Sequence, residues 1–182
     1  MRNVLFLVCV MMTALLCTAC ERQDRGGDAS ATPFAARQGG GAPMDQFSLP
    51  SAVDNTKVDS RVFQDQVLLV TFFATWCPPC LEEIPALIDL QDKYSGSGFS
   101  VVGLSMDEEG PGVVKSLIDK TGINYPVLMA DRQVARNFGG ISGIPTTFLV
   151  NRSGMIIMRY IGYTDYDALA LDIQEALTAG KG

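Results

Sequence analysis

The polar and apolar positions of this chain fall into three consecutive regions. An apolar run from Val4 to Leu16 follows a short positive start, and a stretch rich in Gly, Ala, Arg, Gln and Asp extends from Glu21 to Pro43. From Met44 onward, short apolar runs alternate with segments of helical periodicity. This alternation predicts one layered α/β domain, in which helices pack on a sheet.

The elements expected in this domain follow from their periodicity. Val67 to Phe73 is apolar nearly throughout, as expected of a central strand covered on both faces. Cys77 to about Tyr94 has apolar residues at helical spacing, and Pro85 should kink that helix because proline lacks a backbone donor. Further strands are expected at 47–49, 99–106, 126–129, 144–150 and 155–161, the last two as a hairpin, and further helices at 113–120, 134–138 and 165–179.

The N-terminal region has the pattern of an export signal. Its apolar run is short for a membrane-spanning helix, and small residues precede Cys20 as at a cleavage site. The segment Leu16-Cys17-Thr18-Ala19-Cys20 resembles the lipobox of bacterial lipoproteins, with Cys17 where that pattern usually has leucine. The expected organisation is a lipoprotein signal peptide at 1–19, a flexible tether at 20–43 that starts with a lipidated Cys20, and a folded domain at 44–182.

A cleaved secreted form and an uncleaved anchor are the alternatives to the lipoprotein. All three place the domain outside the cytoplasm. The expected location is the bacterial cell envelope, with the lipid anchor holding the protein to a membrane and the domain facing the periplasm or extracytoplasmic space.

Composition narrows the candidate chemistry to cysteine. The 182 residues are 47% hydrophobic and 19% charged, which suffices for one ordinary core plus a tail. The formal net charge of −6 argues against a nucleic-acid partner. The chain has no histidine, which excludes Ser-His-Asp hydrolysis, Cys-His proteolysis and the usual zinc and copper ligand sets. With Cys9, Cys17 and Cys20 assigned to the signal and the anchor, only Cys77 and Cys80 remain in the domain.

The pair Cys77 and Cys80 is compatible with a metal clip, a structural staple or a redox centre. A structural zinc site needs four Cys or His ligands, and a copper-binding chaperone would have to hold its ion with these two thiolates alone. A staple across so short a loop removes little entropy from the unfolded chain, about 2 kcal/mol. The redox interpretation agrees best with the local pattern, because the free N–H groups and the dipole at a helix start stabilise a thiolate.

In the redox interpretation the two thiols have different roles. Cys77 leaves a buried strand and precedes the first helical turn, so its sulfur should be exposed and attack as a thiolate. Cys80 lies over the same helix face and would be the resolving thiol. Pro78 and Pro79 lack N–H groups, so the thiolate should be less stabilised than in strong oxidants, which favours a reductase. No cofactor beyond the Cys77–Cys80 disulfide is expected.

Two motifs carry a resemblance to a known family. The segment Phe72-Phe73-Ala74-Thr75-Trp76-Cys77-Pro78-Pro79-Cys80 resembles the active site of the thioredoxin superfamily, in particular its extracytoplasmic TlpA/ResA-like branch, which includes the reductases of cytochrome c maturation. A second segment, Gly143-Ile144-Pro145-Thr146-Thr147-Phe148-Leu149-Val150, matches the stretch that packs beside the cysteines in that family. The resemblance implies a single thioredoxin-like domain with a central mixed β-sheet flanked by helices, roughly from Met44 to Thr178.

The resemblance also implies roles for individual residues. Pro145 would be cis, and Ile144 would offer its backbone to an extended substrate. Trp76 would shield the cysteine pair and contribute to the partner surface. The alternatives are an ordinary trans-proline at a strand start and a tryptophan buried in the core.

Two positions concern proton transfer. Cytoplasmic thioredoxins carry a buried aspartate six residues before the first cysteine, where this chain has Thr71. Glu83 matches a glutamate that the ResA-like branch uses near its thiols, so it is the candidate for moving the proton of Cys80. The alternative is that Glu82 and Glu83 lie on a solvated face and only complement the helix N-terminus.

The expected function is that of an extracytoplasmic thiol–disulfide oxidoreductase that reduces protein disulfides. Its clients would be disulfide-containing extracytoplasmic proteins, with apocytochrome c among them, and its electron donor a membrane thiol reductase of the DsbD or CcdA kind. The competing functions are a copper-binding chaperone and a peroxiredoxin-type peroxidase acting through a sulfenate on Cys77. The peroxiredoxin motif has threonine three residues before its cysteine, where this chain has Ala74.

Overall fold

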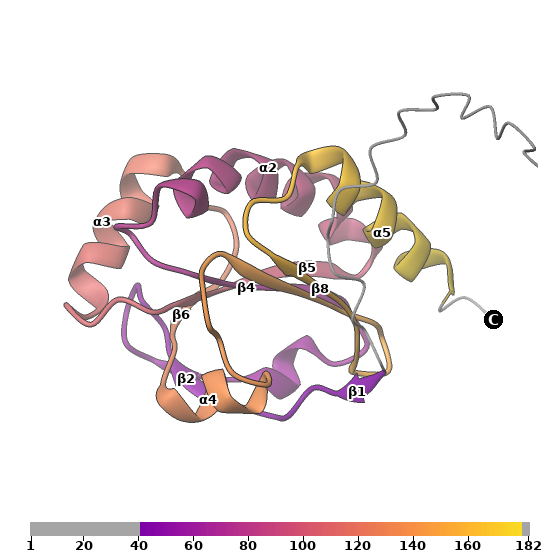
Figure 1. The fold of residues 1–182 in the computed structure, drawn as a ribbon, viewed down its shortest axis with the longest axis horizontal. Helices are drawn as coiled ribbons and strands as arrows, with labels where there is room; N and C mark the ends of the chain where they lie inside the picture. Colours follow the sequence, from indigo (N-terminus) through magenta and orange to yellow (C-terminus); the bar gives the residue numbers. More distant parts are fainter. Residues whose placement is uncertain (1–40, 180–182) are drawn as a thin grey trace, which may run out of the picture. The chain divides into compact units, whose positions relative to one another are not determined.

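A computed structural model describes residues 41–179, and a six-stranded mixed sheet forms their centre (Figure 1). From one edge to the other, the strands are β1 (Ala42–Pro43), β8 (Met155–Ile161), β7 (Thr146–Val150), β4 (Val67–Phe73), β5 (Phe99–Ser105) and β6 (Val127–Met129). β4, β5 and β6 are parallel to one another, whereas β7 is antiparallel to β4 and to β8. The sheet is therefore mixed, as predicted.

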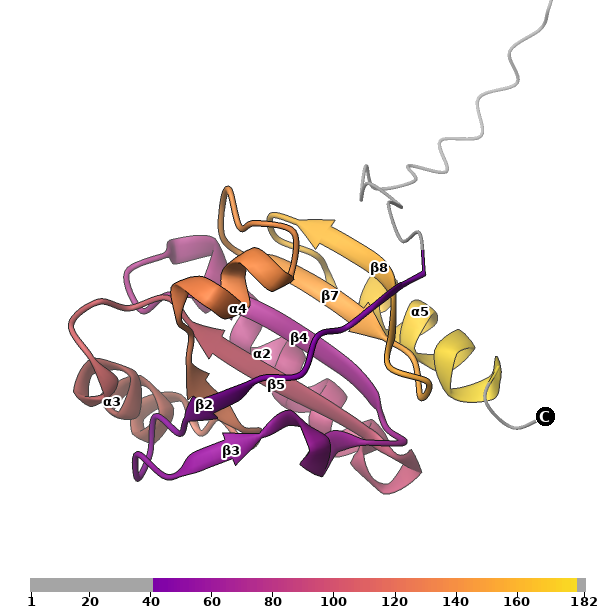
Figure 2. The ribbon, with the colours of Figure 1, turned by 90° about the horizontal axis from the view of Figure 1, so that it is seen from below.

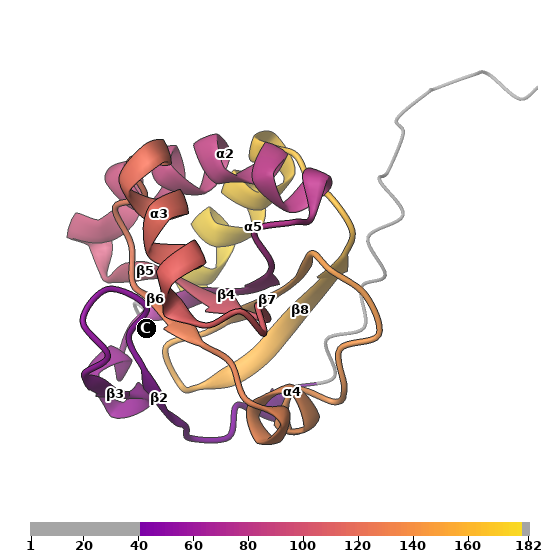
Figure 3. The ribbon, with the colours of Figure 1, turned by 90° about the vertical axis from the view of Figure 1, so that its left-hand side faces the viewer.

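Helices cover both faces of this sheet (Figures 1 and 3). One face carries α2 (Pro78–Tyr94), α3 (Pro111–Thr121) and α5 (Tyr166–Ala179). The other carries α4 (Arg132–Asn137), the hairpin of β2 (Ser48–Pro50) and β3 (Lys57–Asp59), and the 3-10 turn η1 (Ser60–Phe63). A further 3-10 turn, η2 (Ser95–Ser97), follows α2. The described residues thus have the expected thioredoxin-like α/β architecture.

The two layers correspond to two hydrophobic clusters, one on each side of the sheet. Leu87 of α2, Val114 of α3 and Ile173 of α5 belong to the first cluster, together with both cysteines of the candidate pair. The second cluster contains Phe72, Phe138 and Phe148, whose rings contact one another at centroid distances of 4.9–6.0 Å. Because alternate residues of a strand point to opposite faces, β4 contributes side chains to both clusters.

The predicted elements lie within two residues of the observed ones. Val67–Phe73 is a strand over its whole predicted length, and all seven residues are buried. α2 continues through Pro85 to Tyr94, with the proline on its exposed side. The segments β1, β3, η1 and η2 were not predicted, because elements of two to four residues carry too little periodicity to be recognised.

The first residues of the described chain belong to the sheet, although the sequence predicted a tether there. Ala42 pairs with Ile156 and Pro43 with Met155, so the sheet begins two residues before the predicted domain start at Met44. The predicted signal peptide, the lipidation site Cys20 and the tether up to residue 40 lie outside the described residues. No helix among residues 41–179 is long and apolar enough to cross a membrane.

The sheet topology brings the two motifs of the family resemblance to the same end of the central strands β4 and β7. β4 ends at Phe73 and α2 begins at Pro78, so the intervening loop lies at the carboxyl end of β4. β7 runs antiparallel beside β4 (Figure 2), and Thr146 is paired with Phe72. The residue directly before β7, Pro145, therefore lies next to the loop that leads to Cys77.

Candidate active site

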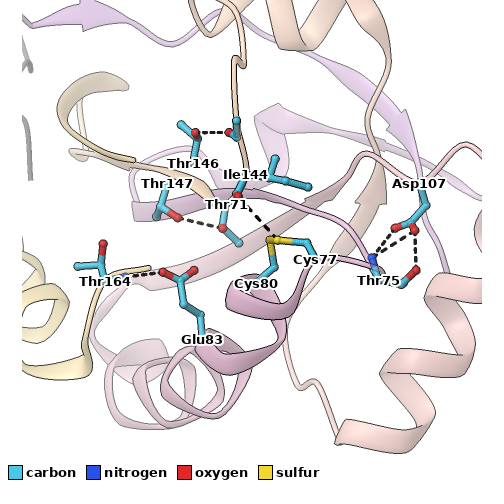
Figure 4. The surroundings of a disulfide bond; sticks show 11 residues. Thr71, Thr75, Cys77, Cys80, Glu83, Asp107, Ile144, Thr146, Thr147 and Thr164 are labelled. Atoms are coloured by element: carbon cyan, nitrogen blue, oxygen red, sulfur yellow. Dashed lines mark hydrogen bonds between the residues drawn. A yellow bond between two sulfur atoms is a disulfide. The ribbon is translucent and has the colours of Figure 1, made fainter. Parts of the chain in front are cut away.

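A disulfide bond joins Cys77 and Cys80 at the start of α2 (Figure 4). Their Cα atoms are 5.3 Å apart, a usual distance for a disulfide. Cys77 is the N-cap residue of the helix, and prolines occupy the first two helical positions. These prolines fit there because the first N–H groups of a helix have no partner within it. The two sulfurs that the sequence paired are thus bonded at a helix N-terminus.

The sulfur of Cys77 is more enclosed than the sequence predicted. The expectation was an exposed attacking thiol, but only 4% of Cys77 is exposed, and Cys80 is 2% exposed. The carbonyl oxygen of Ile144 lies 3.7 Å from the Cys77 sulfur. The prediction of exposure was wrong because the loop before β7, 67 residues away in sequence, packs against the sulfur. In the reduced state a Cys77 thiol can donate to the same carbonyl.

The peptide bond between Ile144 and Pro145 is cis, as the family resemblance implied. Pro145 is buried, and its carbonyl accepts a hydrogen bond from the backbone N–H of Gly162 at 2.8 Å. Thr146 adds a bond from its hydroxyl to the carbonyl of Gly143 at 2.7 Å. These bonds tie both sides of the cis bond to the sheet, with the carbonyl of Ile144 turned toward the disulfide (Figure 4).

Glu83 is a buried carboxyl group on the inner face of α2. It is 2% exposed, and its Oε1 accepts a 2.7 Å hydrogen bond from the backbone N–H of Thr164. Burial raises the pKa of Glu83 to about 7, although the hydrogen bond from Thr164 opposes the rise. The alternative of a solvated helix face fits its neighbour Glu82, which is exposed, but not Glu83. A carboxyl group with this pKa can both give and take a proton near neutral pH.

Thr71 occupies the position of the thioredoxin aspartate. It is 2% exposed, and its hydroxyl oxygen accepts a hydrogen bond from the Thr147 hydroxyl at 2.9 Å across the pair β4–β7. This pair is polar but does not titrate in the accessible pH range. Proton transfer at the cysteines therefore has no carboxyl group to use at this position.

Trp76 points away from the core, with 63% of its surface exposed. The alternative that it is a core aromatic is wrong. Its position directly before Cys77 places a large apolar group at the surface near the disulfide.

Asp107 was not recognised from the sequence. It is 7% exposed and accepts hydrogen bonds from Thr75, two residues before Cys77 (Figure 4). It also accepts a hydrogen bond from the hydroxyl of Ser105. The signal that could have revealed it is its position: it follows a buried strand parallel to β4, and the carboxyl ends of parallel strands meet at one edge of a sheet. Asp107 and Glu83 are the two buried carboxyl groups of the described chain.

Within residues 41–179, no group of three or more Cys, Asp or Glu side chains could hold a metal ion.

Known proteins are similar to this chain in sequence and in fold. The profile of the Redoxin family matches residues 39–176. The thiol-disulfide oxidoreductase ResA of Bacillus thuringiensis (strain Al Hakam) is 27% identical over 110 residues, which cover 60% of this chain and 63% of ResA. The thiol:disulfide interchange protein DsbE of Haemophilus influenzae is 32% identical over 126 residues, covering 67% of this chain and 66% of DsbE. The matches thus span just under two thirds of these relatives' own length.

Solved structures agree with the fold. The crystal structure of a thiol:disulfide interchange protein, a thioredoxin family protein from Chlorobium tepidum TLS, has a TM-score of 0.70 and 34% sequence identity. The superposition covers 75% of this chain and 97% of that one. Because the Redoxin profile matches most of the chain and the fold agrees, the chain belongs to the Redoxin family, as a TlpA/ResA-like member of the thioredoxin superfamily.

Proposed function

We propose that this protein is an extracytoplasmic thiol–disulfide oxidoreductase that reduces disulfides in other proteins. The observation that carries the proposal is the Cys77–Cys80 disulfide at the N-terminus of α2, with cis-Pro145 and the carbonyl of Ile144 beside it. The names of the relatives, thiol-disulfide oxidoreductase and thiol:disulfide interchange protein, support the same chemistry.

The two cysteines act in sequence. In the reduced protein, the Cys77 thiolate attacks one sulfur of a client disulfide; the client S–S bond breaks, a mixed disulfide forms and one client thiolate leaves. The Cys80 thiolate then attacks the sulfur of Cys77. The mixed disulfide breaks, the second client thiolate leaves, and the Cys77–Cys80 bond seen in this structure forms. Two electrons pass from the enzyme to the client, whose two thiolates take up protons.

Glu83 takes the proton that Cys80 must lose before it attacks. Cys80 is 2% exposed, so bulk water has little access to it. Glu83 follows one helical turn later on the same face, and its pKa of about 7 lets it accept a proton near neutral pH. Thr71 offers no titrating alternative.

The direction of electron flow is toward the client. Pro78 and Pro79 remove two N–H donors from the helix start that faces Cys77, so its thiolate is less stabilised than that of strong oxidants. Weaker stabilisation of the Cys77 thiolate makes the reduced state of the protein less favourable relative to the disulfide. The reduced protein therefore gives up its two electrons readily. After each cycle a membrane thiol reductase of the DsbD or CcdA kind returns two electrons to the disulfide.

The proposed location is the bacterial cell envelope, with lipid on Cys20 anchoring the chain to a membrane. Disulfide-containing proteins of the extracytoplasmic space are the proposed clients, including apocytochrome c. The support for this assignment is the export pattern of the N-terminus and the ResA and DsbE relatives.

Trapping the mixed disulfide tests the proposal directly. The full-length Cys80→Ser variant should accumulate client proteins bound through Cys77, because the resolving thiol is missing. The Cys77→Ser variant is the matched control and should trap none. Equal recovery from both variants, or a reduction potential near the −120 mV of strong oxidants, would contradict the proposal. Copper bound stoichiometrically by the reduced protein against a chelator would instead indicate a chaperone.

A further inference from the structure

Asp107 is a buried carboxylate that the proposed chemistry does not use. It lies in the loop after β5 and is 7% exposed. Burying a carboxylate costs free energy unless hydrogen bonds replace its lost hydration. In the part of the chain that the structure describes, no lysine or arginine forms an ion pair with it. Hydrogen bonds from neighbouring residues therefore have to stabilise this group.

Most of those hydrogen bonds come from one residue, Thr75. The backbone N–H of Thr75 lies 3.0 Å from Oδ2 and 3.2 Å from Oδ1 of Asp107, and its hydroxyl donates to Oδ1 at 2.5 Å. On the other side, the hydroxyl of Ser105 donates to Oδ2 at 2.8 Å and accepts from the N–H of Asp107 at 3.1 Å. Ser105, the last residue of β5, thus hydrogen-bonds to the Asp107 carboxylate, and this carboxylate hydrogen-bonds to Thr75.

The contact lies at the ends of two central strands. Phe73 and Ser105 are paired at the ends of β4 and β5, and the N–H of Met106 donates to the carbonyl of Phe73 at 2.8 Å. The paired register of β4 and β5 ends at Phe73 and Ser105. Beyond it, Asp107 hydrogen-bonds to Thr75, which is two residues before Cys77. Asp107 in this way connects the end of β5 to the loop that carries the attacking sulfur.

We propose that Asp107 is a positioning residue that, through Thr75, keeps the sulfur of Cys77 beside the carbonyl of Ile144. In the oxidised protein the bond to Cys80 also restrains that sulfur. After reduction this bond is gone, and the position of Cys77 depends on the backbone of its loop. Asp107 therefore matters most in the reduced, attacking state. The inference rests on the proposed function, because it assigns the residue to thiol–disulfide exchange.

The test compares the reaction of reduced Cys77 in variants of the full-length chain. Asp107→Ala removes the acceptors, and Thr75→Val removes one donor while keeping the N–H. Thr75→Ser keeps both donors and is the conservative variant. Asp54→Ala is the matched control, since Asp54 accepts from the N–H and the hydroxyl of Thr56 in an exposed turn, at 3.1 and 2.8 Å.

Two quantities are measured in the folded, reduced protein: the pH dependence of alkylation of Cys77 by iodoacetamide, followed by mass spectrometry, and its rate of reaction with glutathione disulfide. For Asp107→Ala we expect a shifted alkylation midpoint and a rate that is lower by roughly ten- to a hundredfold, the cost of a small misplacement of a reacting group. Thr75→Val should show a smaller loss. Thr75→Ser and Asp54→Ala should behave as the wild type.

Wild-type values of both quantities in folded Asp107→Ala would overturn the inference, as would equal losses in Asp107→Ala and Asp54→Ala. A loss in Thr75→Ser as large as in Thr75→Val would also overturn it, because the hydrogen-bond donors would then not matter. These readouts need no client protein. Failure to trap any client with the Cys80→Ser variant would therefore contradict the proposed function without deciding the role of Asp107.

Discussion

Replacement of Glu83 by glutamine should change how the stability of this protein depends on pH. Burial raises the pKa of Glu83 from 4.5 to about 7 in the folded state. In the unfolded chain the carboxyl group ionises at its ordinary pKa, so between these two values the folded protein retains a proton that the unfolded chain has lost. The stabilisation from this retained proton is complete below pH 4.5 and is lost as the pH rises through about 7.

The size of this loss in the free energy of unfolding follows from the difference between the pKa values of Glu83 in the unfolded and the folded protein. Each pH unit within it lowers the free energy of unfolding by about 1.4 kcal/mol. Over the interval from 4.5 to about 7, the loss therefore approaches ~3 kcal/mol. Glutamine has nearly the same shape, does not ionise and keeps an oxygen that can accept from the N–H of Thr164. Glu83→Gln should match the wild type near pH 4 and exceed it by about 3 kcal/mol near pH 8.

Urea unfolding of the oxidised proteins at a series of pH values measures this difference. Glu82→Gln is the control, because Glu82 is exposed on the neighbouring helix position and should leave the pH dependence unchanged. Parallel stability curves for the wild type and Glu83→Gln between pH 4 and 8 would refute the reasoning. In that case, burial would not be what sets the protonation of Glu83.

Three further predictions concern the core, the redox pair and the partner surface. Leu69→Ala, at a fully buried position of β4, should lower the free energy of unfolding measured with urea by about 2–5 kcal/mol. As the control, Val62→Ala, at a position 62% exposed, should change this free energy by less than about 0.5 kcal/mol. The oxidised protein should be more stable than the reduced one by up to about 2 kcal/mol in the same assay, and a more stable reduced form would argue for an oxidant instead. Trp76→Ala should lower kcat/KM for protein disulfides but leave the rate with glutathione disulfide unchanged, because this side chain is exposed and would contact only large partners. Equal losses with both substrates would contradict a role at the partner surface.

The longer elements of the fold could be predicted because their sequences carry strong periodicity. Val67–Phe73 is apolar nearly throughout, and this pattern is enough to identify a strand buried on both faces. β1 pairs with β8, more than a hundred residues away, and β3 pairs with β2 across a turn. Such short strands exist only through their partners, so local sequence does not reveal them.

The candidate site also combines features that local sequence predicts with contacts that it does not predict. The spacing of Cys77 and Cys80 at a predicted helix start favoured a redox pair over a metal clip or a staple, because the helix dipole acts locally on the thiolate. Local sequence did not show that Cys77 is covered by Ile144 or that Asp107 reaches Thr75. These contacts join residues 67 and 32 positions apart.

By itself, the sequence predicted an α/β fold from its periodicity and the pair Cys77 and Cys80 from residue type and spacing, and its resemblance to the ResA-like branch indicated Glu83 as the candidate acid–base group. Only the tertiary structure decided the environment of these groups. It places Glu83 out of solvent, encloses the sulfur of Cys77 and connects the active-site loop to β5 through Asp107. The physical reason is that burial, and with it the pKa of a carboxyl group, depends on which distant segments pack against a residue.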